Sequence, residues 1–163
     1  MADGTGRPVA RSPRAGSVPG MAQIRVSTTL DAPPEKVWAD IEDVGSHVEW
    51  MADAVAIRFL TDRRQGVGTR FECDTKVGPI TLTDVMEITE WAPAEAMGVD
   101  HVGLVGGTGR FTLTPIWGGR TRFQWQEDLR FPLWMGGPVG AFFGRPVLSW
   151  IWRRNLQALH RRF

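Results

Sequence analysis

The segment GRTRFQWQEDLRF, residues 119–131, alternates strictly and constrains the fold more than any other stretch. Every second residue falls on one mostly apolar face, and the charged and amide side chains between them fall on the other. A period of two predicts a β-strand with one face in the core and one in solvent. Glu127 breaks the pattern, since it lies on the apolar face between Trp125 and Leu129. A carboxylate among aromatic rings is costly unless it is paired, protonated or hydrated. The sequence therefore predicts a pocket rather than a solid core.

Composition limits the class of protein. A chain of 163 residues that is 42% hydrophobic can form one globular domain with a sizeable core. A net charge of +1 does not favour a nucleic-acid partner, and no apolar run is long enough to span a membrane. The lone Cys73 excludes an internal disulfide and favours a cytoplasmic location. The scattered His and Cys residues lack ligand spacing, so we expect no metal site and no cofactor.

The chain divides into a tail and one domain. Residues 1–20 contain mainly Gly, Pro, Arg, Ser and Ala, with no apolar stretch typical of a secretory signal. This composition predicts a disordered tail, followed by a single ligand-binding domain over residues 21–163. Either Met1 or Met21 could be the translation start.

Alternation and turn residues predict the order of the elements. A Pro-Pro pair after Asp31 is typical of a helix start, and its apolar face would be Val37, Trp38 and Ile41. We expect a second short helix over residues 44–50. The predicted strands are 23–30, 55–61, 69–77, 80–91, 95–102, 110–117 and the alternating segment. The glycine-rich loop 103–109 precedes a strand rather than a helix, which favours a turn over a phosphate-binding loop.

The last part of the chain changes to helical periodicity. An apolar stripe at a spacing of 3.6 predicts a long C-terminal helix, with Pro146 in or near its first turn or at a kink. The stripe consists of Leu148, Ile151, Trp152, Asn155, Leu156 and Leu159. The amide of Asn155 must find a partner there, which could be Glu127, backbone, water or a ligand.

Several short motifs carry a resemblance to a known superfamily. They are LDAPPEKVW at 30–38, Asp43, Trp50, GTRF at 68–71, EWAP at 90–93 and GRT at 119–121, together with the terminal helix. Over residues 23–163 the chain resembles the START-like or Bet v 1-like (SRPBCC) superfamily, and most of all its bacterial polyketide cyclase/dehydrase and lipid-transport branch. The resemblance implies an α+β helix-grip fold: a curved seven-stranded antiparallel sheet wrapped around a long C-terminal helix, with two short helices after the first strand. It also implies a ligand cavity between sheet and helix.

Hairpin registers predict which side chains meet. Facing residue numbers in an antiparallel pair sum to a constant, and apolar faces must match. The predicted pairs are Val77–Ile80, Thr75–Leu82, Cys73–Asp84 and Phe71–Met86, then Ile88–Met97, Met86–Val99 and Asp84–His101, and finally Leu113–Phe123, Phe111–Trp125 and Gly109–Glu127. We therefore expect Cys73, Asp84 and His101 to form a row across three strands, and Glu127 to face the open space beside a glycine.

These polar residues have alternative roles. Asp84 and His101 could satisfy each other, contact a ligand, or act in acid–base chemistry. Glu127 could reach an Arg or Asn155 on the helix, line the cavity, or act in catalysis. The weak catalytic candidates are therefore Asp84, His101 and Glu127, although the two carboxylates are three strands apart and a direct dyad is not expected. Cys73 fits a small core residue better than a nucleophile.

Three classes of function remain open. The first is a carrier or sensor of a small hydrophobic molecule such as a lipid, quinone, isoprenoid or aromatic polyketide. The second is a cofactor-independent cyclase or dehydrase, and the third is a regulatory or interaction protein. Segment 134–143 could form a cavity mouth, a dimer contact or a peripheral membrane contact, in a monomer or homodimer. The expected ligand contacts are Phe71, Cys73, Asp84, Met86, Val99, His101, Phe111, Trp125, Glu127, Trp152 and Asn155.

Overall fold

The structure is a computed structural model that describes residues 22–103, 105–130, 133 and 136–163. The predicted tail, residues 1–20, lies outside the described residues. The elements are β1 (Ala22–Leu30), α1 (Pro34–Ile41), the 3-10 helix η1 (Val44–Glu49), β2 (Ala54–Phe59), β3 (Arg70–Val77), β4 (Ile80–Ala92), β5 (Ala96–Val102), β6 (Gly106–Ile116), β7 (Arg120–Arg130) and α2 (Gly137–His160). This order confirms the predicted α+β helix-grip fold with two short helices after the first strand.

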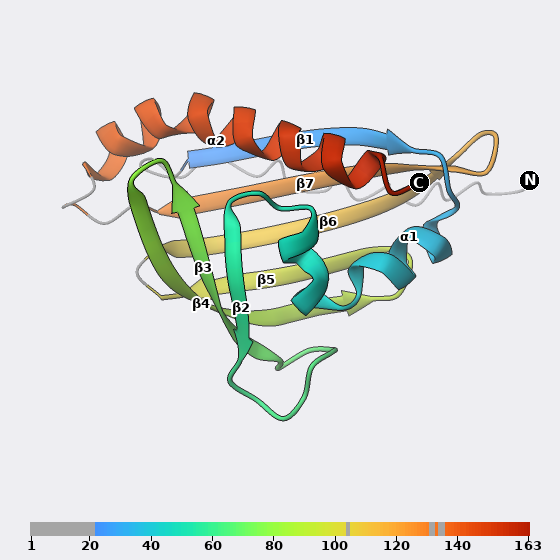
Figure 1. Cartoon of the computed structure of the whole chain (residues 1–163), viewed down its shortest axis with the longest axis horizontal. Coiled ribbons are helices and arrows are strands. Elements are labelled where there is room, and N and C mark those ends of the chain that lie inside the picture. Colours follow the sequence, from blue (N-terminus) through green and yellow to red (C-terminus); the bar gives the residue numbers. More distant parts are fainter. Residues whose placement is uncertain (1–21, 104, 131–132, 134–135) are drawn as a thin grey trace, which may run out of the picture.

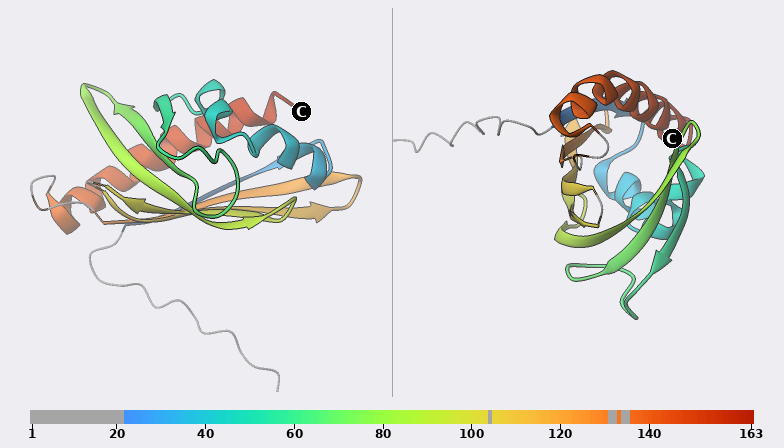
Figure 2. Two further views of the ribbon diagram at one scale, coloured as in Figure 1. Left: turned by 90° about the horizontal axis from the view of Figure 1, so that it is seen from below. Right: turned by 90° about the vertical axis from the view of Figure 1, so that its left-hand side faces the viewer.

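The seven strands form one antiparallel sheet in the order β1-β7-β6-β5-β4-β3-β2. The sheet curls, so that β2 and β3 rise opposite β1 and β7 (Figure 1). Helix α2 lies along β1 and β7, and α1 and η1 lie in the opening between α2 and the far edge of the sheet (Figure 2). The apolar faces of the strands point into this concave space, which holds the core.

Helix α1 begins and packs as its sequence predicts. Pro33 and Pro34 stand at the start of the helix, where a missing N–H costs nothing. Val37, Trp38 and Ile41 form the buried face, as predicted. The hydroxyl of Thr121 in β7 donates to the carbonyl of Ala32 at 2.7 Å, and both residues are buried. This bond ties the helix entry to the sheet.

Helix α2 packs tightly along its C-terminal half. Trp152, Asn155, Leu156 and Leu159 of the predicted stripe are buried, whereas Leu148 and Ile151 are half-buried. The helix begins at Gly137, so Pro146 lies inside it rather than near its first turn. The first-turn alternative was wrong, because a proline inside a helix removes one backbone hydrogen bond but does not have to end the helix.

Segment 134–143 also differs from its prediction. Its residues from Gly137 onward belong to α2, although two of them are glycines. Residues 134 and 135 lie outside the described part of the chain. The predicted cavity mouth or contact patch is therefore largely the first two turns of the helix.

Two of the three predicted registers are confirmed. The β3–β4 pairs, including Cys73 with Asp84, and the β6–β7 pairs, including Gly109 with Glu127, match the structure. The β4–β5 register was wrong by two residues, because His101 faces Met86 and Ile88 faces Val99. A bulge between Ile88 and Glu90 shifts the ladder. A shift of two keeps every side chain on its face, so apolar patterning cannot detect it.

Strand β6 begins at Gly106, four residues earlier than predicted, so part of the expected loop 103–109 is strand. Gly107 faces His101 on one side and Leu129 on the other. It has a φ of +145°, and a Cβ there would collide with the carbonyl oxygen of Asp128. Glycine is therefore required for close backbone approach within the strand, not for a turn.

We predict that Thr121→Val destabilises the fold by about 1–3 kcal/mol, because it leaves the buried Ala32 carbonyl without its donor. The measurement is urea unfolding at neutral pH. The matched control is Thr114→Val on the exposed side of β6, expected to change stability by less than about 0.5 kcal/mol. Equal effects of the two substitutions would contradict a role for this bond.

Candidate functional site

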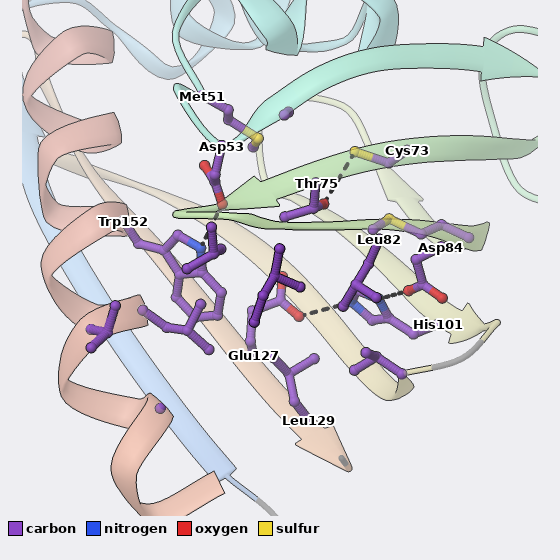
Figure 3. Close-up of a pocket in the computed structure, with 18 of the residues that line it drawn as sticks. Met51, Asp53, Cys73, Thr75, Leu82, Asp84, His101, Glu127, Leu129 and Trp152 are labelled. Carbon is purple, nitrogen blue, oxygen red and sulfur yellow. Dashed lines mark hydrogen bonds and ion pairs between the residues drawn. The ribbon is translucent and has the colours of Figure 1, made fainter. Parts of the chain in front are cut away.

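A cavity of about 330 Å³ lies between α2, the β3–β4 hairpin and the inner face of β5 to β7. Figure 3 shows Trp152 on the helix side, Asp53 and Thr75 on the hairpin side, and Glu127 beneath them. A smaller cavity of about 80 Å³ adjoins it beneath η1 and shares Met51, Trp125 and Glu127 as walls. The predicted ligand contacts that line the larger cavity are Cys73, Asp84, Met86, His101, Trp125, Glu127 and Trp152, and those that line the smaller one include Phe71, Val99 and Phe111.

His101 joins the two carboxylates of the site. Its Nδ1 lies 2.6 Å from Oδ2 of Asp84, and its Nε2 lies 3.0 Å from Oε2 of Glu127 (Figure 3). All three side chains are about 8% exposed. No direct dyad exists between these carboxylates, as expected, but a single imidazole connects them. Asp84 reaches His101 although the two are not directly opposite in the register.

The geometry favours a protonated His101. A neutral imidazole has one N–H, whereas each ring nitrogen here faces a carboxylate oxygen. Burial by itself lowers the pKa of His101, but the hydrogen bonds to Asp84 and Glu127 outweigh burial and raise that pKa to about 9. The site therefore holds a cation between two acidic side chains at neutral pH.

Two glycines give the carboxylates room. A Cβ on Gly109, which faces Glu127 across β6 and β7, would lie 2.5 Å from Oε1 of that side chain. A Cβ on Gly103 would collide with Oδ1 of Asp84. The open space predicted beside Glu127 is thus occupied by its own carboxylate. Any other residue at either position would displace an acidic side chain.

Glu127 has a second fixed contact, and it is not the one expected. Its Oε1 accepts a hydrogen bond from Nε1 of Trp125 at 2.7 Å. The Trp125 ring stacks on Trp152 of α2, with centroids 4.8 Å apart. Neither Asn155 nor an arginine bonds to Glu127 among the described residues. The carboxylate is held from its own strand because α2 presents an indole, rather than a polar side chain, at this level.

Asn155 has two partners: a backbone N–H, which was one of the expected alternatives, and Asp53, which sequence reasoning missed. Its Nδ2 donates to Oδ1 of Asp53 at 2.5 Å, and its Oδ1 accepts from the backbone N–H of Ala52 at 3.0 Å. Trp152 Nε1 donates to Oδ2 of Asp53 at 3.3 Å. Asn155 lines neither the larger nor the smaller cavity. The unmet need of a buried amide indicated that a partner exists, but not that it lies in the loop before β2.

Burial is the main influence on the pKa values of two other side chains, Cys73 and His47. Burial raises the pKa of the Cys73 thiol to about 11, so the thiolate is scarce at neutral pH and the residue is a poor nucleophile. Burial lowers the pKa of His47 to about 4, although its Nε2 lies 2.7 Å from the carbonyl oxygen of Ile41. His47 is therefore neutral and donates to that carbonyl. It lines the smaller cavity.

The family model for "Polyketide cyclase / dehydrase and lipid transport" matches residues 21–163. The chain belongs to this family. The match agrees with the resemblance in the sequence and with the helix-grip fold, in which a cavity separates sheet and terminal helix. A search of curated proteins finds no match.

Solved structures share the fold at low sequence identity. A Thermus thermophilus protein, TTHA0849, is 18% identical with a TM-score of 0.71, over 86% of this chain and 95% of that one. The ZhuI aromatase/cyclase of Streptomyces sp. R1128 is 16% identical with a TM-score of 0.65, over 86% and 90%. A START superfamily protein of Mycobacterium smegmatis is 13% identical with a TM-score of 0.71, over 86% and 95%. These likenesses support the fold.

No helix in the described part of the chain is long and apolar enough to cross a membrane. The His, Cys, Asp and Glu side chains of the described residues form no group of three arranged to hold a metal ion.

We predict that His101 stays protonated on both ring nitrogens at pH 8, while His47 is neutral already at pH 6. The reason is that two carboxylates face His101, whereas His47 is buried against a carbonyl. Nitrogen-15 NMR of the histidine rings would measure both. Because its pKa is raised on folding, the His101 cation stabilises the fold fully below about pH 6.5 and loses this effect as the pH rises toward 9. A neutral His101 at pH 7 would contradict the arrangement in which both ring nitrogens donate to carboxylates.

Proposed function

We propose that this protein binds a small hydrophobic molecule in the 330 Å³ cavity, as a carrier or sensor. The cavity itself is the observation that carries the proposal, since protein interiors are otherwise packed without voids of this size. Most of its wall is apolar, with a few polar side chains among the lining residues. Such a cavity is typical of a ligand site. The family to which the chain belongs includes lipid transport in its description.

The cavity has an apolar rim through which a hydrophobic molecule could enter. Ile80 at the tip of the β3–β4 hairpin is 52% exposed, and Val147 on α2 is 49% exposed, yet both line the cavity. An apolar entrance favours lipids, quinones, isoprenoids or aromatic polyketides over polar metabolites.

The helix face toward the cavity offers a direct test. Gly144 lines the cavity, and a Cβ built on it meets nothing within 4 Å. Gly144→Phe should place a ring in the open space and reduce binding of an uncharged, apolar naphthalene dye at least tenfold. Tryptophan quenching would measure the affinity, and native mass spectrometry would detect any ligand that co-purifies.

Gly144→Ala is the matched control. It adds one methyl group and removes the helix penalty of glycine, so it should bind the probe like the wild type and be more stable by up to about 1 kcal/mol. Unchanged binding in a folded Gly144→Phe protein would place the ligand elsewhere. Failure of the wild type to bind any apolar probe would overturn the proposed function.

The site also favours a second candidate, an enzyme of the cyclase or dehydrase type. The specific observation is the imidazole of His101 held between two buried carboxylates. In this scheme Glu127 takes a proton from the carbon next to a ketone carbonyl. The C–H electron pair forms the enolate, and the adjacent imidazolium balances the charge on the site.

We predict, for this candidate, that the protein accelerates hydrogen–deuterium exchange of the α-protons of 2-tetralone in deuterated buffer. Glu127→Gln should lower the rate by about 10²-fold, within the usual contribution of a general base. Glu87→Gln, an exposed carboxylate on β4, is the control and should have no effect. Proton NMR measures the exchange, and a wild-type rate equal to that of buffer would exclude this activity.

A further inference from the structure

The hydrogen-bonding capacity of the cavity wall is unbalanced. We infer that the ligand is an apolar molecule that carries a hydrogen-bond donor, such as a phenolic or alcoholic hydroxyl, and not a carboxylate or phosphate. This inference rests on the proposed function, because it concerns the same cavity. It follows from a comparison of the donors and acceptors that the described lining residues present.

The strong donors of the wall are already used. Both ring nitrogens of His101 bond to carboxylates. The indole N–H of Trp125 bonds to Glu127, and that of Trp152 bonds to Asp53. The remaining side-chain donors in the described lining are the hydroxyl of Thr75 and the thiol of Cys73, which lie 3.8 Å from each other.

The acceptors of the wall are not used up. Asp53, Asp84 and Glu127 all line the cavity, and a carboxylate offers about four lone-pair positions. Each oxygen of Glu127 accepts one bond. Each oxygen of Asp53 also accepts only one side-chain bond among the described residues, from Asn155 and from Trp152. Unmet acceptors in a buried site favour a ligand group that can donate.

The charged side chains of the lining also favour an uncharged ligand over an acidic one. The described lining contains three carboxylates and one imidazole, and it contains no lysine or arginine. An acid headgroup would enter without a cation to pair with and would face these carboxylates at low dielectric, which is strongly unfavourable. A hydroxyl adds no charge and can donate to Glu127 or Asp53. The apolar remainder of the wall suits the rest of such a molecule.

Three matched probes test this inference: 2-naphthol, 2-methylnaphthalene and 2-naphthoate, titrated at pH 7 by tryptophan quenching and calorimetry. We expect 2-naphthol to bind most tightly, 2-methylnaphthalene more weakly, and 2-naphthoate at least tenfold more weakly than 2-naphthol. Glu127→Gln keeps the shape of the side chain and removes its charge, so it should reduce the preference for 2-naphthol over 2-naphthoate at least threefold. Glu87→Gln, outside the cavity, should leave the preference unchanged.

The outcomes separate this inference from the proposed function. Binding of all three probes with 2-naphthoate as tight as 2-naphthol overturns the inference and leaves the hydrophobic site standing. No binding of any probe overturns both. The wild-type ranking decides the matter even if Glu127→Gln does not fold, and circular dichroism at pH 7 establishes whether it does.

Discussion

The structure depends on an uneven contact between helix α2 and the sheet. The helix face toward the cavity reads Gly140, Gly144, Leu148 and Trp152 at steps of four residues. Farther along, Leu156 and Leu159 are fully buried and hold the helix against the core. Small residues in one half and large ones in the other leave space at one end and close packing at the other. The change in side-chain size along one face of α2 therefore creates the cavity.

The polar groups divide into two clusters with different consequences. Asn155, Asp53 and the backbone of Ala52 connect α2 to the loop before β2, next to the tightly packed half of the helix. The cluster around His101 lies on the sheet, with Glu127 at the cavity wall. The first cluster satisfies a buried amide and holds an edge of the cavity in place. The second presents acceptors to whatever enters.

Part of this arrangement could be predicted from the sequence. Alternation placed Glu127 on the inner face, and turn residues gave its register with Gly109, because both depend on local geometry. The β4–β5 register was missed since a shift of two residues preserves the alternation on which such reasoning relies. Asp53 was missed because a loop residue has no periodicity. Gly144 was missed as a cavity residue because glycine in an apolar segment resembles a chain break until the helix is seen to continue through it.

The cluster around His101 is poorly explained as a device for stability. Buried ion pairs recover little more than the cost of removing their charges from water, and apolar side chains of similar size often serve as well. Here the cluster also requires glycine at 103 and 109, positions where a side chain could otherwise fill space. Two positions thus give up side-chain packing to keep two carboxylates around one imidazole beside a cavity. A ligand that uses these acceptors would repay that cost, whereas the protein alone gains little from it.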